Sequence, residues 1–331
     1  MPDILSHWLL GQRLLKNEAF VSAFPALNRE AFLWGCQGPD PLFFHRRFPW
    51  QTGSLRAYGS LLHVGDPTAI LHSLAKICRY CRGRANEQTV FSYALGFCTH
   101  YCYDRAAHPL VYYNCDLLRK TEEGAGRDNH HIRIECNLDV MLLRHDTGRL
   151  MQDVRLTECL PACENLESMM ALLYSLLLCD LFGVHTPRGT AMTIASDYRM
   201  HQMLREDPHA FKKRTADAAE SLLPYVTHRM RPGVYSDRIH PMTPDMSFDY
   251  GNLLHSTWFN PKDHTQRSHL NFYELTDLAE AESLTLTALF EEEVRSRGAV
   301  DFAAFTHGID FHGCHFDAAE AVPPAEQEAE A

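Results

Sequence analysis

The sequence lacks an apolar stretch long enough to cross a membrane. Its longest, from Met169 to Phe182, contains Ser175 and Asp180 and falls short of the roughly 20 residues that a bilayer-spanning helix needs. The first residues, MPDILSHWLLGQRLL, have no basic start, no long apolar run and no small-residue cleavage site, so no secretory signal is predicted. Eleven cysteines without an export signal predict reduced thiols and a cytoplasmic location.

Basic residues are also in short supply. The 331 residues include 31 Lys and Arg against 42 Asp and Glu, a formal net charge of −11. Phosphate backbones select basic surfaces, so stable nucleic-acid binding is not expected. Glycine (18) and proline (17) are too few for a collagen-like or low-complexity chain, and no phosphate-binding glycine loop of the GxxxxGK[ST] or GxGxxG type occurs. A hydrophobic content of 45% instead predicts a folded globular protein.

Strand signals are scarce as well, because no run alternates apolar and polar residues over six positions between turn residues. Helix signals recur, as apolar residues at helical spacing and as Asp-Pro or Thr-Pro starts. We therefore predict an all-α fold, with one multi-helix domain over residues 1–316 and an acidic, disordered tail over 317–331. Helices are expected over 4–15, 67–81, 87–107 (ending near Pro109), 129–145, 166–182 and 273–297, helix starts at 187 and 208, and loops over 36–60 and 231–270.

Histidine is abundant, with 20 residues, and part of this excess is ordered on predicted helices. His100, Asp104 and His108 lie at positions i, i+4 and i+8, and each four-residue step drifts by only ~40° around a helix, so the three side chains share one face. Imidazole and carboxylate groups are ligands that zinc accepts, and a buried Asp104 without a cation would be costly. His131 and Glu135 repeat the i, i+4 spacing, and two such helices can face each other across a bundle core.

Several other patterns have a plainer interpretation. Four cysteines at short spacings suggest a structural zinc site, but thiols on helices are commonly just buried: Cys78, Cys81, Cys98 and Cys102. The adjacent His145-Asp146 is similar to the metal-binding pair of HD-type phosphohydrolases, although its place near a helix end favours a C-terminal cap. A polar surface loop, more than a metal site, is expected from His307, His312, Cys314 and His315. His131 and Glu135 alone would also suit a solvated helical pair.

Taken in chain order, the chemistry-bearing residues resemble the zinc-dependent phospholipase C family, whose superfamily also includes single-strand nucleases. The matching segments begin with Ser6-His7 and continue with FLWGCQGPD ending at Asp40, Leu62-His63, YALGFCTHYCYD with His100 and Asp104, then His108, and finally His131-x3-Glu135. Residues 258–272 resemble a more loosely shared C-terminal segment. The resemblance implies an all-α, phospholipase C-like domain with its metal site between helices.

The resemblance also implies a set of metal ligands and a base. One zinc would be held by Asp40, His63, His100 and Asp104, and a second by His108, His131 and Glu135. A third would use His7, with Asp104 as a bridging ligand, so two or three ions are expected. In the family Asp40 is the usual candidate for the catalytic base.

The function implied is a metal-dependent hydrolase of phosphoric esters, in which zinc-bound hydroxide attacks phosphorus and no nucleophilic Ser or Cys is needed. The substrate would be a phospholipid headgroup or a small soluble ester. Two alternatives stay open: a non-catalytic metal-binding or interaction protein on the same scaffold, and a nuclease-like phosphodiesterase. The nuclease would need aromatic stacking platforms, for which the candidates near Asp40 are Trp34, Phe43, Phe44 and Trp50, although core packing is their simpler use. The oligomeric state is not indicated.

Overall fold

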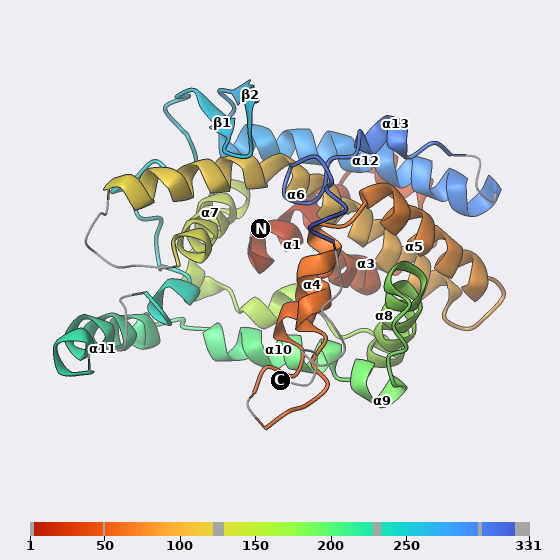
Figure 1. Ribbon diagram of the computed structural model, residues 1–331, viewed down its shortest axis with the longest axis horizontal. Coiled ribbons are helices and arrows are strands. Elements are labelled where there is room, and N and C mark those ends of the chain that lie inside the picture. The colour runs from red at the N-terminus through yellow and green to blue at the C-terminus, as the bar shows by residue number, and fades with distance from the viewer. Residues whose placement is uncertain (1–2, 49, 122–128, 228–232, 297–299, 322–331) are drawn as a thin grey trace.

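The computed structural model describes residues 3–48, 50–121, 129–227, 233–296 and 300–321, and this part is mainly helical (Figure 1). The all-α prediction is therefore confirmed. The α-helices are α1 (Ile4–Leu14), α2 (Glu18–Ala23), α3 (Arg29–Gly35), α4 (Arg56–His63), α5 (Pro67–Cys81), α6 (Glu87–Thr121), α7 (His130–Thr147), α8 (Leu166–Phe182), α9 (Arg188–Ala191), α10 (Ile194–Arg205), α11 (Phe211–Thr227), α12 (Phe272–Ser296) and α13 (Ala303–Thr306). Short 3-10 turns are η1 (Asp40–Phe44), η2 (Met151–Asp153), η3 (Leu156–Cys159) and η4 (Ser236–Arg238), and the strands are β1 (Trp258–Asn260) and β2 (Asp263–Ser268).

The long helix α6 is the axis on which the other elements assemble. It packs against α12, which runs alongside it in Figure 1, and against α3, α5 and α7. The contact with α3 is between backbones: a Cβ atom on Gly96 would lie 2.2 Å from the carbonyl oxygen of Phe32, and one on Gly35 would lie 2.0 Å from that of Tyr93. Only glycine permits so close an approach. These two glycines therefore seat α3, and the turn that follows it, directly on α6.

Helix α6 continues through Pro109, so the predicted helix end near this residue is wrong. Proline normally disrupts a helix because it has no amide hydrogen for the carbonyl four residues earlier, here Arg105. The tertiary structure accommodates the proline, since the backbone at Gly313 packs there: a Cβ atom on Gly313 would lie 2.8 Å from the Arg105 carbonyl oxygen and 2.5 Å from Pro109 Cγ. The buried side chains of Leu110 and Val111 then carry the apolar face onward. His108 consequently remains on the same helix as Asp104.

Most other predicted helix ends agree with the structure within a few residues. Asp3 accepts a hydrogen bond from the Ile4 amide at the start of α1, and α5 begins at Pro67 as predicted. The start predicted at 208 is displaced: α11 begins at Phe211, where the Asp207 carboxylate accepts from its amide at 2.9 Å. Helices α2, α3, α4, α10 and α13 were not predicted. Residue 297, the predicted end of the last long helix, and residues 322–331 of the acidic tail lie outside the described residues, and the single domain over 1–316 stays a prediction.

A two-stranded antiparallel hairpin departs from the helical pattern. Strand β1 pairs with β2 in a register that sets Trp258 opposite Ser268 and contains a bulge after Phe259. The sequence predicted a loop here, because β1 has three residues and β2, with the sequence DHTQRS, is polar throughout and carries no alternation. The hairpin packs through β1 on α6.

Candidate metal centre

The eight predicted ligands come from five elements, and the structure brings all of them into compact groups. Seven are buried and His131 is half-buried. Their ligand atoms lie within 4.8 Å of one another in three groups: His7, His100 and Asp104; Asp40, His63 and His100; and His108, His131 and Glu135. His100 belongs to the first two groups, so these two adjoin. Residues far apart in sequence, on α1, η1, α4 and α6, thus meet at one point.

Asp104 belongs to the first group, and its carboxylate also lies close to His63 of the second. Its Oδ1 lies 3.3 Å from His7 Nε2, and its Oδ2 lies 3.1 Å from His100 Nε2 and 3.5 Å from His63 Nε2. On the other side, His63 Nε2 lies 3.2 Å from Asp40 Oδ1. Four ligands at 2.0–2.1 Å around a tetrahedral zinc ion are separated from one another by about 3.3 Å. The spacing in this group is therefore the spacing of ligands around an ion, and the two oxygens of Asp104 face different histidines.

The atoms that point into this cluster have no hydrogen-bond partner among the described residues. They are buried and comprise Nε2 of His7, Oδ1 of Asp40, Nε2 of His63, Nε2 of His100 and both carboxylate oxygens of Asp104. Buried polar atoms are normally hydrogen-bonded, because leaving one without a partner costs about 1–3 kcal/mol. A set of orphaned nitrogen and carboxylate oxygen atoms converging on one point fits zinc.

The histidine rings are oriented by main-chain carbonyl groups. His63 Nδ1 lies 2.7 Å from the Gly59 oxygen and His100 Nδ1 lies 3.1 Å from the Cys36 oxygen. A carbonyl oxygen can only accept, so each Nδ1 donates its proton, and in the neutral ring each Nε2 then keeps a lone pair. Metal-binding histidines are held in this way by their second nitrogen. The structure therefore presents both side chains in the tautomer that a metal ion requires.

The turn that carries Asp40 is held against the cluster by a hydrogen bond from α8 and by a close contact with His100. Tyr174 donates its hydroxyl to the Gly38 carbonyl oxygen at 2.5 Å. Gly38 itself has φ of +49°, and a Cβ atom there would lie 2.2 Å from His100 Cδ2. Since both the backbone conformation and the space exclude a side chain, this glycine lets the Asp40 turn close on the imidazole of His100.

Burial and charge act on the ionisable groups in opposite directions. Burial raises the pKa of Asp40. Burial acts the same way on Asp104, but the charges of His100 and His108 outweigh it and hold the pKa of Asp104 well below its usual value. For His63, burial is outweighed by the two carboxylates, which raise its pKa to about 9. Among the described residues no Lys or Arg forms an ion pair with either carboxylate. The two buried carboxylates therefore rely on the neighbouring imidazoles, or on a bound cation, for positive charge.

The third group lies between α6 and α7. His131 Nε2 is 2.6 Å from Glu135 Oε1, and the rings of His108 and His131 are 5.9 Å apart. Glu135 is buried, so the pair is more than a solvated helical contact. The Nδ1 atom of His108 donates to the carbonyl oxygen of Phe311 at 2.5 Å, a partner from the C-terminal loop. Helices α6 and α7 therefore face each other as the sequence predicted. The His108 ring is oriented by a residue of the distant C-terminal loop.

The C-terminal loop also places His312 in the centre, where the sequence predicted a polar surface loop. The His312 ring lies 5.2 Å from that of His108 and 6.0 Å from that of His63. Burial and the nearby His63 lower the pKa of His312 to about 3. The loop is shaped by Asp310, whose Oδ1 accepts from the His312 and Cys314 amides at 2.9 Å. The prediction of a surface loop is therefore wrong for His312. The local excess of histidine was the only feature of the sequence that indicated a role for this residue in the centre.

Asp139 is a second residue that the sequence reasoning missed. Its fully buried carboxylate accepts from the amides of Leu5 and Ser6 and from His240 Nε2, each at 2.9 Å. It lies one turn after Glu135 on α7 and fixes the first turn of α1, which carries His7. The i, i+4 spacing of Glu135 and Asp139 on one helix is the sequence feature that could have indicated its role.

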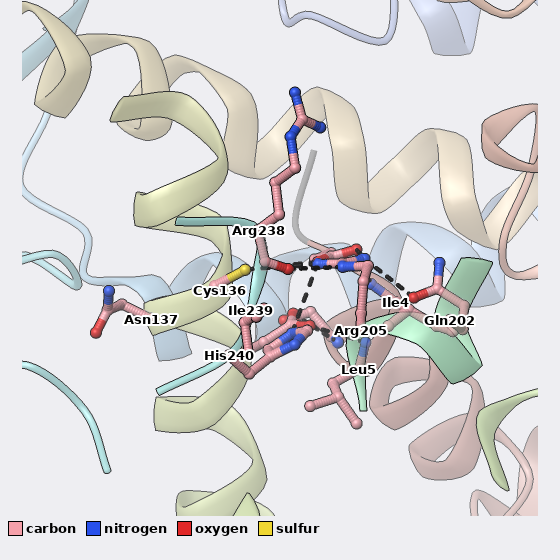
Figure 2. Close-up of polar contacts among 12 residues, drawn as sticks. Ile4, Leu5, Cys136, Asn137, Gln202, Arg205, Arg238, Ile239 and His240 are labelled. Carbon is pink, nitrogen blue, oxygen red and sulfur yellow. Dashed lines mark hydrogen bonds and ion pairs between the residues drawn. The ribbon is translucent and has the colours of Figure 1, made fainter. Parts of the chain in front are cut away.

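A fourth group of potential ligands adjoins this point: Asp3, Cys136 and His240. Figure 2 shows Arg205 and His240 meeting beside the start of α1. Arg205 forms an ion pair with Asp3 and donates from Nε to the Arg238 carbonyl oxygen at 2.7 Å. The guanidinium therefore supplies the positive charge here, and this group has no need of a metal ion.

The remaining patterns have structural roles. The four cysteines at 78, 81, 98 and 102 are buried and belong to none of the ligand groups found in the described chain. Asp146 is bound by Arg13 at 2.6 Å, and the His145 ring stacks on Tyr273 at 4.1 Å, away from the centre. Trp34 is fully buried in the core, whereas Trp50 is 77% exposed and stacks on Phe48.

The ligand groups open onto a cavity of about 940 Å³. Six side chains of the centre form part of its lining: Asp40, His63, His108, His131, Glu135 and His312. Phe43 and Phe44 line it as well, and the Phe43 ring stacks against His63 at 5.1 Å. A small molecule bound in this cavity would contact ligands from both sides of the centre.

Comparison with known protein families gives a match over much of the chain. Residues 6–182 fit the family described as zinc dependent phospholipase C. The matched segment is more than half of the chain and contains all eight predicted ligands, from His7 to Glu135, but ends before α9 and before the loop that carries His312. No curated protein and no solved structure matches the chain. No helix in the described part combines the length and apolar character needed to span a bilayer.

Proposed function

The chain belongs to the zinc-dependent phospholipase C family, and from that membership we propose that it hydrolyses phosphodiesters at a centre of two or three zinc ions. Family membership and the ligand groups together support a metal-dependent hydrolase. The observation that carries the proposal is the set of buried nitrogen and carboxylate oxygen atoms that converge without hydrogen-bond partners.

In this proposal the ligands divide as the family resemblance implies. Asp40, His63, His100 and Asp104 would hold one ion. His108, His131 and Glu135 would hold another. His7, together with Asp104, would contribute to a third. Zinc at such a site lowers the pKa of bound water towards neutrality and stabilises the charge on phosphate oxygens.

The protein's own residues position the reactants. Asp40 lines the cavity, and its Oδ1 is directed at His63. We assign to this carboxylate the orientation of the attacking water and the acceptance of its proton. The neighbouring prolines and the Tyr174 hydrogen bond to Gly38 limit movement of the turn. His312, between His63 and His108, borders the space in which the phosphate would lie.

The cytoplasmic location is also part of the proposal. All eleven cysteines are unpaired in the structure, and most are buried. Their state agrees with a reducing compartment.

Metal content and turnover test the function together. Protein purified without chelators is expected to contain at least two zinc ions per chain by elemental analysis and to hydrolyse p-nitrophenyl phosphodiesters. Asp104→Asn preserves size and helix but removes the charge shared by two groups, so more than one zinc ion and all turnover should be lost while the helical circular dichroism persists. His145→Ala is the matched control and should leave both unchanged.

The alternatives are outcomes of the same experiment. Bound zinc with no turnover of any phosphoester would identify a non-catalytic metal protein. Preferential cleavage of single-stranded nucleic acid over small esters would identify a nuclease. Protein that contains no zinc and takes up none on titration contradicts the proposal.

A further inference from the structure

The cavity at the metal centre is also lined by basic side chains, which the metal ligands do not explain. Four arginines contribute to its lining: Arg47, Arg56, Arg205 and Arg238. Arg205 is neutralised by Asp3. Within the described residues, none of the other three forms an ion pair with a carboxylate. In a chain with a net charge of −11, three unpaired guanidinium groups on one cavity are a local reversal of charge.

The guanidinium groups are close enough to influence one another. Burial, followed by the charges of Arg238, Arg56 and Arg205, lowers the pKa of Arg47. Arg47 is half-buried, with its Cζ 5.8 Å from the centre of the Phe44 ring. Gathering like charges at a partly desolvated surface is unfavourable unless an anion binds there. Guanidinium groups bind phosphate and carboxylate with paired, charge-assisted hydrogen bonds.

Arg238 is fixed by its backbone, and its side chain is left available. Its carbonyl oxygen accepts from Arg205 Nε, and its Nε donates to the Val234 carbonyl oxygen at 3.1 Å. In Figure 2 the Arg238 side chain extends away from the polar network around Arg205 and His240. The network therefore holds the main chain of η4 without using the Arg238 charge.

The turn η1 joins the arginines to the metal centre. It begins with Asp40, and its two last residues face different ways: the Phe43 ring stacks on His63 at 5.1 Å, whereas the Phe44 ring lies 5.2 Å from His201 and beneath Arg47. Asp40, Phe43, Phe44 and Arg47 all line the cavity, so a phosphodiester at the metal centre and a group among the arginines would share one space.

We propose that this cavity selects phosphodiesters whose headgroup carries a second anionic group, a phosphate or a carboxylate, which Arg47, Arg56 and Arg238 bind. The proposal rests on the function proposed above, because it names the class of substrate for the same centre. A cationic headgroup would meet like charge at the three arginines and is disfavoured there by repulsion.

The test uses a matched series of p-nitrophenyl phosphodiesters with one leaving group and four second alcohols: choline, propanol, 3-hydroxypropionate and 3-hydroxypropyl phosphate. We expect kcat/KM for an anionic member to exceed that for the propyl ester by at least tenfold, with choline poorest. The better of the two anions distinguishes phosphate from carboxylate. A dihexanoylglycerol ester of the favoured headgroup distinguishes a lipid from a soluble substrate.

Arg47→Met and Arg238→Met should each reduce the preference for the anionic ester about tenfold while kcat/KM for the propyl ester stays within twofold. Arg214→Met is the control, since it removes the same charge from an exposed position outside the cavity. Equal loss on the propyl and anionic esters would show that the arginines bind the scissile phosphate and would overturn the proposal. Equal kcat/KM values for the cationic, neutral and anionic esters would overturn the proposal as well.

A binding measurement separates this proposal from the proposed function. Calorimetric titration with 1,3-propanediol bisphosphate and with propyl phosphate is carried out on zinc-loaded and on chelator-treated protein. Tighter binding of the bisphosphate that is lost in Arg47→Met supports the arginine site even if no ester is cleaved. Cleavage of esters combined with equal binding of the two phosphates retains the hydrolase and refutes the arginine site.

Discussion

Replacing Asp139 with Asn tests how the start of α1 is attached to the metal centre. The buried carboxylate accepts three hydrogen bonds, from the amides of Leu5 and Ser6 and from His240. Hydrogen bonds to a charged group contribute about 1.5–3 kcal/mol each, and the negative charge at a helix N-terminus adds about 0.3–1 kcal/mol. The Asn side chain keeps only one acceptor oxygen, and its NH2 group would face one of the former donors, so at least one hydrogen bond is lost. We therefore expect Asp139→Asn to lower the free energy of unfolding by about 3–5 kcal/mol.

Urea unfolding of the zinc-loaded protein, followed by circular dichroism, measures this loss, and elemental analysis measures zinc in the folded variant. Because Asp139 holds the turn that carries His7, zinc content should fall as well. Asp153→Asn is the control: its exposed carboxylate accepts from the Leu150 amide at 3.1 Å, and the change should cost less than about 1 kcal/mol. A loss below about 1 kcal/mol in Asp139→Asn, with zinc retained, would refute the reasoning.

Three further predictions concern the centre itself. Gly38→Ala should weaken zinc binding about 10- to 100-fold in a chelator competition, because its Cβ atom would lie 2.2 Å from His100 Cδ2 in a left-handed backbone; unchanged affinity would contradict the close approach. His312→Ala should lower kcat/KM at least tenfold with the zinc content unchanged, whereas His315→Ala, at an exposed position of the same loop, should alter neither. Removing zinc with a chelator should lower the melting temperature by several degrees in differential scanning fluorimetry, since a ligand at 1,000 times its Kd adds about 4 kcal/mol; an unchanged value would argue against buried metal.

The sequence predicted those parts of the fold that depend on local pattern. Helix α8 spans the apolar run from Leu166 to Phe182, and α5 begins at Pro67 with Asp66 as its N-cap, as the Asp-Pro pair predicts. Local pattern failed where tertiary contacts decide the outcome. Pro109 is an ordinary helix terminator by itself, yet α6 continues through it, with Gly313 packed against the proline ring and the Arg105 carbonyl. The polar strand β2 likewise exists because β1 pairs with it.

The candidate site divides in the same way. The spacing of His100, Asp104 and His108 on one helix was sufficient to predict a metal-binding face, since a helix fixes which side chains lie together. His312 was interpreted as a surface residue because nothing within its own loop shows that the loop folds back over α6. The arginines of the cavity come from three separate segments, and no spacing in the sequence relates them.

The hydrogen bond between His108 Nδ1 and the Phe311 carbonyl oxygen has a consequence for protein synthesis. All eight predicted ligands leave the ribosome early, since none lies beyond Glu135. The carbonyl group that fixes the His108 imidazole is made much later. A nascent chain that has just completed α7 therefore holds every ligand but lacks the partner that orients one of them. The third ligand group acquires its final geometry only after translation has passed Phe311.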